Sequence, residues 1–251
     1  MSALTRRAFS QQTLGSLLTF SLLETLVCGD ALADDVKPVT ASWLAELDAL
    51  GRDVRGRKIK QVEWQTKVEE LMTRVDMKDM LRFIDFEKLA ASVKLRERGE
   101  LSVRPKFPQV EGLPTELVFG HQVFALGKDR SVVPHGHDNM ATAFLILKGK
   151  FAGKHYDRLA DEGDHMIITP TIDREFTVGE YSTVSDHKDN VHWFKSLGDA
   201  GFIFNIHVLN VDPQSGKRSG RVYVDPNGEK LAGGKIKARR ISGDEAVKLY
   251  G

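Results

Sequence analysis

The sequence predicts a mainly β fold, either a sandwich, a barrel or a jelly roll, preceded by an α-helical segment. Two observations support this prediction. From Glu116 onwards, short runs rich in Val, Ile and Phe follow one another, with turn residues between them. Before residue 97, apolar residues instead recur every three or four positions, which is the period of one face of a helix.

The helical segment covers residues 61–96. Its clearest signal is a single apolar face formed by Trp64, Val68, Leu71, Met72 and Val75. Asp76 and Asp85 are expected to cap two further short helices. Residues 97–115 carry several charges and three prolines, which predicts a linker or an extended arm, because proline has no backbone N–H to donate.

Residues 34–60 are polar and predict irregular structure, with one short helix over 42–50. Strands are expected over residues 117–126, 132–137, 141–147, 151–159, 165–170, 176–184, 191–196, 202–211 and 222–224. Asp225-Pro226-Asn227-Gly228 predicts a turn, and a short helix is expected over 243–250. The expected division is a signal (1–33), a helical extension with a proline-containing linker (34–115), a barrel (116–228) and a C-terminal tail (229–251).

The first 33 residues predict an export signal. Paired Arg6 and Arg7 precede a moderately apolar stretch, and Ala31-Leu32-Ala33 is a small-x-small cleavage site. The paired arginines resemble bacterial twin-arginine signals, and an ordinary signal or a weak anchor is the alternative. Glu24 interrupts the apolar stretch, which argues against a membrane-spanning helix. We expect the twin-arginine machinery to export the chain to the periplasm, without stable membrane insertion after cleavage.

Charge and cysteine content exclude several classes of function. The 36 Lys and Arg residues nearly balance the 35 Asp and Glu residues, so the net charge is +1. A chain with this balance has no electrostatic footprint for nucleic acid or for an anionic membrane. The only cysteine, Cys28, lies in the predicted signal, so the remaining chain has no cysteine nucleophile and no ligands for an iron–sulfur cluster. A chain without cysteine also suits an oxidising compartment.

The stretch Pro134-His135-Gly136-His137 is the strongest chemical signal. Successive side chains of a strand alternate between its faces, so His135 and His137 point to the same side. If that side is the interior of a barrel, both imidazoles converge on one point, where they could bind a metal ion. A pair of surface histidines on an edge strand is the alternative. The apolar run over 141–147 favours the buried site.

A third histidine would complete a metal site, and two candidates exist. His192 alternates with apolar Val191 and aromatic Trp193 at the start of a predicted strand. His187 lies among charged residues in a predicted solvated loop. We favour His192 and keep His187 as the alternative. Three imidazoles would leave coordination positions open for water, oxygen or substrate.

Other polar residues are candidates for the surroundings of this site. Asn205 and His207 lie two residues apart on one predicted strand and could point into the barrel. They would then contact substrate or support the ligands, or else form a hydrogen-bonded polar pair in the core. Tyr156 could line the mouth of the barrel, although a hydrogen bond at the end of a strand is the simpler role.

The segment around the histidine pair resembles the first motif of the cupins. The matching residues are Val132-Val133-Pro134-His135-Gly136-His137-Asp138 and Leu145-Ile146-Leu147-Lys148-Gly149. Cupins follow the His-x-His with a glutamate ligand and then a glycine. Counting back from Gly149 places Thr142 at the glutamate position. The resemblance implies a single cupin jelly-roll barrel whose metal site has at most three histidines.

Among cupins, the chain resembles the thiol dioxygenases, specifically the branch of cysteamine dioxygenase and the plant cysteine oxidases. Their Pro-x-His-x-His-x-x-Met segment is matched, with one residue fewer before the first histidine, by Pro134, His135, His137 and Met140. Their Asn-[Ile/Leu]-His segment is matched by Asn190-Val191-His192, whereas Asn205 stands where they usually carry aspartate.

The resemblance implies one divalent metal ion held by His135, His137 and His192. Fe(II) is favoured, and Mn, Zn, Ni or Cu are alternatives. The predicted function is an exported non-haem metal oxidoreductase of the dioxygenase type that acts on a small molecule, with thiols as one candidate class. The alternatives are a non-catalytic periplasmic metal- or ligand-binding protein and a metal-assisted isomerase or lyase. Because cupins often dimerise, a homodimer is a further expectation.

Overall fold

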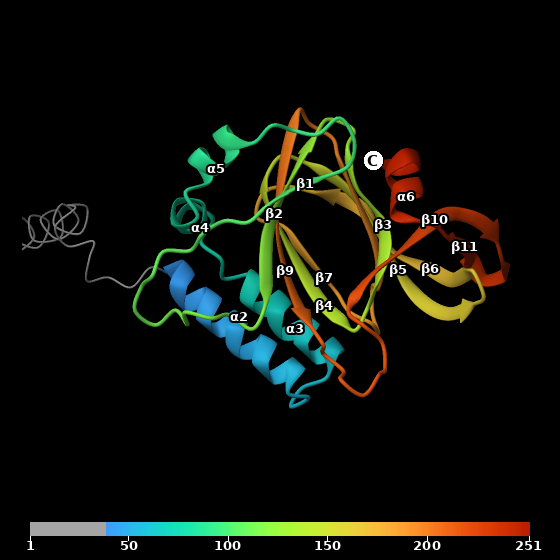
Figure 1. Cartoon of the computed structure of the whole chain (residues 1–251), viewed down its shortest axis with the longest axis horizontal. Coiled ribbons are helices and arrows are strands. Elements are labelled where there is room, and N and C mark those ends of the chain that lie inside the picture. Colours follow the sequence, from blue (N-terminus) through green and yellow to red (C-terminus); the bar gives the residue numbers. More distant parts are fainter. Residues whose placement is uncertain (1–38) are drawn as a thin grey trace, which may run out of the picture. The chain divides into compact units, whose positions relative to one another are not determined.

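The apolar run behind the histidine pair forms strand β4 (Met140–Lys148), which is buried at every residue except Lys148. A strand buried on both faces must lie between two layers, which here are a layer of helices and a second group of strands (Figure 1). The structure, a computed structural model, describes residues 39–251. The predicted export signal over 1–33 lies outside these residues.

The strands form two groups (Figure 1). The first is a five-stranded sheet in the order β1-β2-β9-β4-β7. Besides β4, its members are β1 (Leu101–Val103), β2 (Gly120–Gly127), β7 (Tyr181–Val184) and β9 (Ala200–Leu209). The second group closes on itself in the order β10-β11-β6-β5-β8-β3, because β10 also pairs with β3. Its members are β3 (Ser131–Asp138), β5 (Phe151–Glu162), β6 (His165–Phe176), β8 (Val191–Ser196), β10 (Gly220–Lys230) and β11 (Ile236–Arg240).

Helices cover one face of the five-stranded sheet. They are α2 (Val39–Arg55), α3 (Gln61–Met72), α4 (Met77–Phe83) and α5 (Phe86–Ser92). Helix α3 contacts β4 and β7, and α2 contacts β9. Trp64 and Leu71 of α3 share a core cluster with Leu145 of β4 and Phe204 of β9. The predicted mainly β barrel with an N-terminal helical part is therefore confirmed.

Side-chain alternation along β9 decides what each face of that sheet buries. Phe204 and Ile206 pack with the helices, whereas Ile203 belongs to a second cluster between the two strand groups. Asn205 and His207 share the face of Ile203 and therefore point toward the interior. The interior is thus apolar at one end and polar at the other, where these two residues lie.

Tertiary packing corrects two of the local predictions. The short helix expected over 42–50 within the polar residues 34–60 is present but longer, since α2 covers 39–55. Trp43, Leu44 and Leu47 are buried in the core cluster between the helices and the five-stranded sheet, which we call the helix-side cluster. The turn expected at 225–228 is absent, since β10 runs through it to Lys230 and accommodates it with a bulge opposite β11. Strand β11 itself lies in the part of the chain predicted as a tail.

Of the two helix caps predicted from the sequence, one is present, and the predicted C-terminal helix is present as well. Asp76 caps α4 through a 2.8 Å hydrogen bond from the backbone N–H of Asp79, as predicted. Asp85 precedes α5 in a left-handed conformation, and its side chain makes no capping hydrogen bond. A 3-10 turn (Ala232–Gly234) precedes β11, and the predicted C-terminal helix is present as α6 (Gly243–Tyr250).

Within residues 39–251, no helix combines the length and apolar character needed to cross a membrane.

The helix-side cluster predicts a measurable difference between two positions of α3. Leu71 is buried, whereas Val62 is 40% exposed on the same helix. Leu71→Ala should lower the free energy of unfolding by about 2–5 kcal/mol, because it removes transfer energy and leaves a cavity. The matched control Val62→Ala should change it by less than about 0.5 kcal/mol. Urea denaturation followed by circular dichroism measures both, and equal effects would contradict the assigned packing of α3.

Candidate metal centre

Strand pairing brings three histidines together. In the β3–β8 pair, His135 stands directly opposite His192, and His137 lies two residues further along the same face of β3. The ring centroids are 4.2 Å apart for His135 and His192, and 5.0 Å apart for His137 and His192. All three side chains are buried, and one ring nitrogen from each lies within 4.8 Å of the others.

The hydrogen bonds of these rings leave several nitrogens free for a cation. His135 Nδ1 donates to the carbonyl oxygen of Val133 at 2.7 Å, so the lone pair is on Nε2. Nε2 of His135 and both ring nitrogens of His192 are buried without a hydrogen-bond partner in the described part of the chain. Buried polar atoms are rarely left unpaired in folded proteins. A divalent cation between the rings would satisfy Nε2 of His135 and one nitrogen of His192, so the site fits a metal ion.

Burial keeps the imidazoles in the neutral form that binds metals. Burial, with the nearby Arg221 as the second cause, lowers the pKa of His137 to about 3. Burial also holds the pKa values of His135 and His192 well below the usual value for histidine. These three side chains are therefore neutral at pH 7, and a metal ion would not have to displace protons from them.

Thr142 contacts one of the two histidines on β3. Its Oγ1 is 3.2 Å from Nδ1 of His137, which fixes the orientation of that ring. Within residues 39–251, no carboxylate joins the group of three potential ligands. A cation bound there would keep its full positive charge, because all three ligands are neutral.

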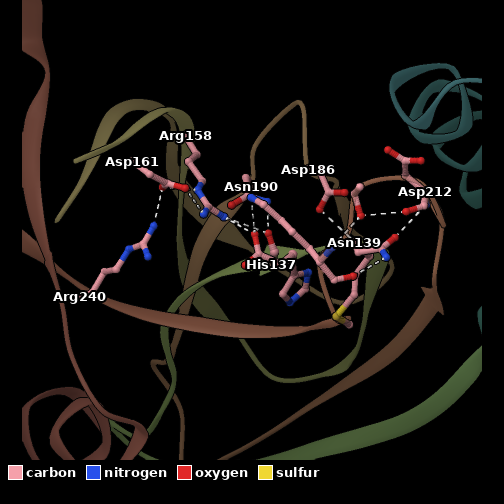
Figure 2. Close-up of polar contacts among 12 residues, drawn as sticks. His137, Asn139, Arg158, Asp161, Asp186, Asn190, Asp212 and Arg240 are labelled. Atoms are coloured by element: carbon pink, nitrogen blue, oxygen red, sulfur yellow. Dashed lines mark hydrogen bonds and ion pairs between the residues drawn. The ribbon is translucent and has the colours of Figure 1, made fainter. Parts of the chain in front are cut away.

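A polar network holds the backbone of His137 from the opposite side (Figure 2). The carbonyl oxygen of His137 accepts hydrogen bonds from Asn190 Nδ2 at 2.9 Å and from Arg158 Nη1 at 3.3 Å. Arg158 also pairs with Asp138 and Asp161, and its hydrogen bond holds the pKa of Asp161 at about 2. The network therefore ties β3 to β5 and to the loop before β8.

Helix α3 anchors the loop that leads into β8. Ser185 Oγ donates to Oε1 of Gln65 at 2.7 Å, and the backbone N–H of Asp186 donates to Oε1 of Gln61 at 2.9 Å. Asn190 then bonds the carbonyl oxygens of both Ser185 and His137. The helical part thus helps to position the strand that carries His192.

A cavity of about 290 Å³ opens beside His135 and His137. Asn205 and His207 line it, as the sequence suggested for residues that point into the barrel. Burial, with Arg221 as the second cause, lowers the pKa of His207 to about 4, so this ring is also neutral at pH 7. Arg221 itself lines the cavity and was not singled out in the sequence, because its strand was predicted to be much shorter.

Two sequence candidates lie elsewhere. Tyr156 does not line the cavity; it packs in a separate cluster with Met166 and Val224, because the neighbouring His155 takes the inward face. His187 does not join the three-histidine group. Its loop places it beside Asp138 and Asp186, in a hollow on the far side of the His137 backbone.

His155 is a buried residue that the sequence did not distinguish. It stands opposite His192 in the β5–β8 pair, and their ring centroids are 6.1 Å apart. Phe176 and Phe194 enclose the ring, and its Nδ1 has no hydrogen-bond partner among the residues that the structure describes. Burial lowers the pKa of His155 to about 3. Its position follows from strand register, which no local sequence signal reports.

Comparisons with known proteins find similarity only among solved structures. No family model matches the chain, and no curated protein matches it. A cupin superfamily protein from Desulfitobacterium hafniense is 17% identical, with a TM-score of 0.32 over 48% of this chain and 87% of that chain. An oxalate oxidase with the substrate analogue glycolate is 14% identical, with a TM-score of 0.35 over 51% of this chain and 56% of that chain. Procruciferin, an 11S globulin from Brassica napus, is 9% identical, with a TM-score of 0.32 over 43% of this chain and 23% of that chain. Similarities at this level of identity and TM-score do not assign a function to this chain.

The low pKa of His155 predicts a dependence of stability on pH. The folded protein keeps this ring neutral down to about pH 3, whereas the unfolded chain binds a proton below the ordinary histidine pKa of 6.5. Acidification through this window therefore favours unfolding, by up to about 1.4 kcal/mol per pH unit for one histidine. His155→Leu should make the fall in unfolding free energy shallower by that amount.

The measurement is urea denaturation of chelator-treated protein between pH 7 and pH 4. Phe194→Leu serves as the control, because it disturbs the same packing without removing a titratable group. A His155→Leu slope equal to that of the unsubstituted protein would show that His155 is not held neutral.

Proposed function

We propose that this protein is a mononuclear metal enzyme, an oxidoreductase of the dioxygenase type, with His135, His137 and His192 as the ligands of one divalent ion. The single observation that carries the proposal is a set of three converging, buried imidazoles with unpaired nitrogens. Two of these imidazoles, those of His135 and His137, line a cavity large enough for a small molecule.

An enzyme is favoured over a storage or structural role by the open side of the site. Structural metal sites are usually closed by a fourth protein ligand, whereas catalytic sites keep a position free. Within the described part of the chain, neither His187 nor His207 belongs to the ligand group, and the cavity reaches His135 and His137. Substrate could therefore approach the ion directly.

Fe(II) is the ion that we favour. Imidazole ligands suit iron, zinc, copper and nickel alike, so the donor set alone does not choose among them. The choice rests on the resemblance of Asn190-Val191-His192 and of the histidine pair to segments of thiol dioxygenases. Bound iron would supply the electron transfer that O₂ chemistry requires.

The chain's own residues would prepare the site for that chemistry. Phe144 packs against His192 at a ring-centroid distance of 4.9 Å and shields this side of the site from water. The Val133 carbonyl and the Thr142 hydroxyl fix the rings of His135 and His137. Neutral ligands leave positive charge on the ion for an anionic substrate group.

Export to the periplasm is also part of the proposal. Protein recovered from that compartment should begin at Asp34, after cleavage of the predicted signal over 1–33.

Ligand substitution tests the assignment of the metal site. The unsubstituted chain should hold about one divalent ion, and His135→Ala, His137→Ala and His192→Ala should each lose it, because two imidazoles cannot enclose the ion. Elemental analysis gives the stoichiometry. At about 1,000 times its Kd, the ion should also stabilise the fold by about 4 kcal/mol.

His187→Ala is the matched control for these variants and should retain the ion. If His187→Ala lost the metal while His192→Ala kept it, the ligand set would be wrong. A folded chain that binds no divalent ion at all would end the proposal.

Oxygen uptake tests the proposed chemistry. Protein loaded with Fe(II) should consume O₂ when a small substrate such as 3-mercaptopropionate is added, and the His137→Ala variant should not. The electron paramagnetic resonance signal after addition of nitric oxide, an O₂ surrogate, should report iron with an accessible position. Tightly bound zinc in protein from its own exported pool, with no uptake after iron loading, would end the redox part and leave the metal site standing.

A further inference from the structure

We infer that the substrate is a small carboxylate, whose anionic group is bound by Arg104 and Arg221 in the wall of the cavity. The inference rests on the proposed function only in placing the reaction beside the three histidines. The preference for an anion is a property of the cavity itself, and it can be measured without a metal ion.

The charges on the cavity wall are all of one sign. Arg104 and Arg221 line it, and among residues 39–251 no Asp or Glu side chain belongs to the lining. Both guanidinium charges are felt inside: after burial, Arg221 and then Arg104 are the causes that lower the pKa of His207. An ammonium group in this cavity would be repelled, whereas a carboxylate would be attracted.

Arg221 is held in place for such a contact. Its residue stands opposite His137 in the β10–β3 pair, so its side chain lies close to the proposed metal ligands. Nη1 donates to Oε1 of Glu100 at 2.8 Å, and the guanidinium lies 5.5 Å from the ring of Phe124. A guanidinium has five N–H donors, and its planar fork matches the two oxygens of a carboxylate. Glu100 fixes the arginine through one of these donors.

Neutral groups complete the wall. Glu100 pairs with Arg221 and offsets one of the two positive charges, so a net positive charge remains. Asn205 accepts a hydrogen bond from Gln122 at 3.0 Å and donates to the Ala143 carbonyl at 3.4 Å, so its amide is fixed. His207 is neutral at pH 7 and can both donate and accept a hydrogen bond. A Cβ atom at Gly120 would lie 2.3 Å from Nε2 of His207, so the glycine makes room for this ring.

Size and charge together narrow the substrate class. A cavity of about 290 Å³ suits a molecule of few heavy atoms, with one end at the histidines and the carboxylate at the arginines. An amine such as cysteamine, which the resembled dioxygenase branch would take, carries the wrong charge for this wall. Inorganic phosphate shares the negative charge and can also pair with a guanidinium, so it serves as the probe for a site that accepts any small anion.

The test measures binding to chelator-treated protein by ligand-observed NMR and titration calorimetry at low salt. The probes are 3-mercaptopropionate, propionate, cysteamine, 2-mercaptoethanol and inorganic phosphate. The two carboxylates should bind, and their Kd should rise as salt is added. Cysteamine and 2-mercaptoethanol should bind at least about tenfold more weakly, because each lacks the charge-assisted hydrogen bonds.

Substitutions then assign the contact. Arg104→Gln should weaken carboxylate binding about tenfold or more, as should the double variant Arg221→Gln with Glu100→Gln, which avoids a half-buried unpaired carboxylate. Arg55→Gln, an equal loss of charge at an exposed position on α2, should leave the Kd unchanged. Arg104 is exposed, so its variant reports on binding without risk to the fold.

The outcomes separate this inference from the proposed function. Equal affinity for cysteamine and 3-mercaptopropionate, phosphate binding as tight as the carboxylates, or unchanged binding in both arginine variants would each overturn the carboxylate assignment, even if metal and oxygen uptake are present. Carboxylate selectivity that depends on both arginines, in a chain that binds no metal, would support the anion site and overturn only the proposed function.

Discussion

The antiparallel pairing of β3 with β8 is the constraint on which the site depends. It places His135 opposite His192, and the same strand β8 places His192 opposite His155 on β5. Three histidines thus form one row across neighbouring strands, with His137 two residues further along β3. A shift of this register by one residue would turn His192 to the other face, because side chains alternate with a period of two. The loop contacts of Asn190 and Gln65 help to fix this register.

Burial of the imidazoles has a cost that explains why a cation suits the site. Each buried ring nitrogen without a partner costs about 1–3 kcal/mol relative to water. His135 and His192 together carry several such atoms, and the surrounding Phe144 and Phe194 offer no hydrogen bonds. The helical layer packs on the apolar outer face of β4 and β9, and their inner face carries both apolar residues and the polar Thr142, Asn205 and His207 at the cavity. The fold can therefore maintain a polar cavity within a well-packed domain.

Positive charge is concentrated in the wall of the cavity. Arg104 and Arg221 lie in its wall, and the neutral histidines lie beside them. The acidic residues near His137, such as Asp138 and Asp161, pair with Arg158 behind the backbone of the strand and do not line the cavity. The single strand β3 thus separates the positively charged cavity wall from the ion pairs of Arg158 with Asp138 and Asp161. The alternation of side chains along β3 produces this separation.

Features that depend on local periodicity can be predicted from the sequence alone. The two-residue spacing of His135 and His137 puts them on one face of any strand, the apolar face of α3 follows from a period of 3.6, and α6 ends where the sequence predicted. Features that depend on strand pairing follow from the folded structure. Register places His192 beside His135 and His137 and leaves His187 outside this group of three, and it turns Tyr156 away from the cavity. Strand β10 begins at Gly220, earlier than the sequence predicted, so Arg221 stands opposite His137. Pairing joins residues far apart in the chain, and a single sequence contains no local signal for which strands will meet.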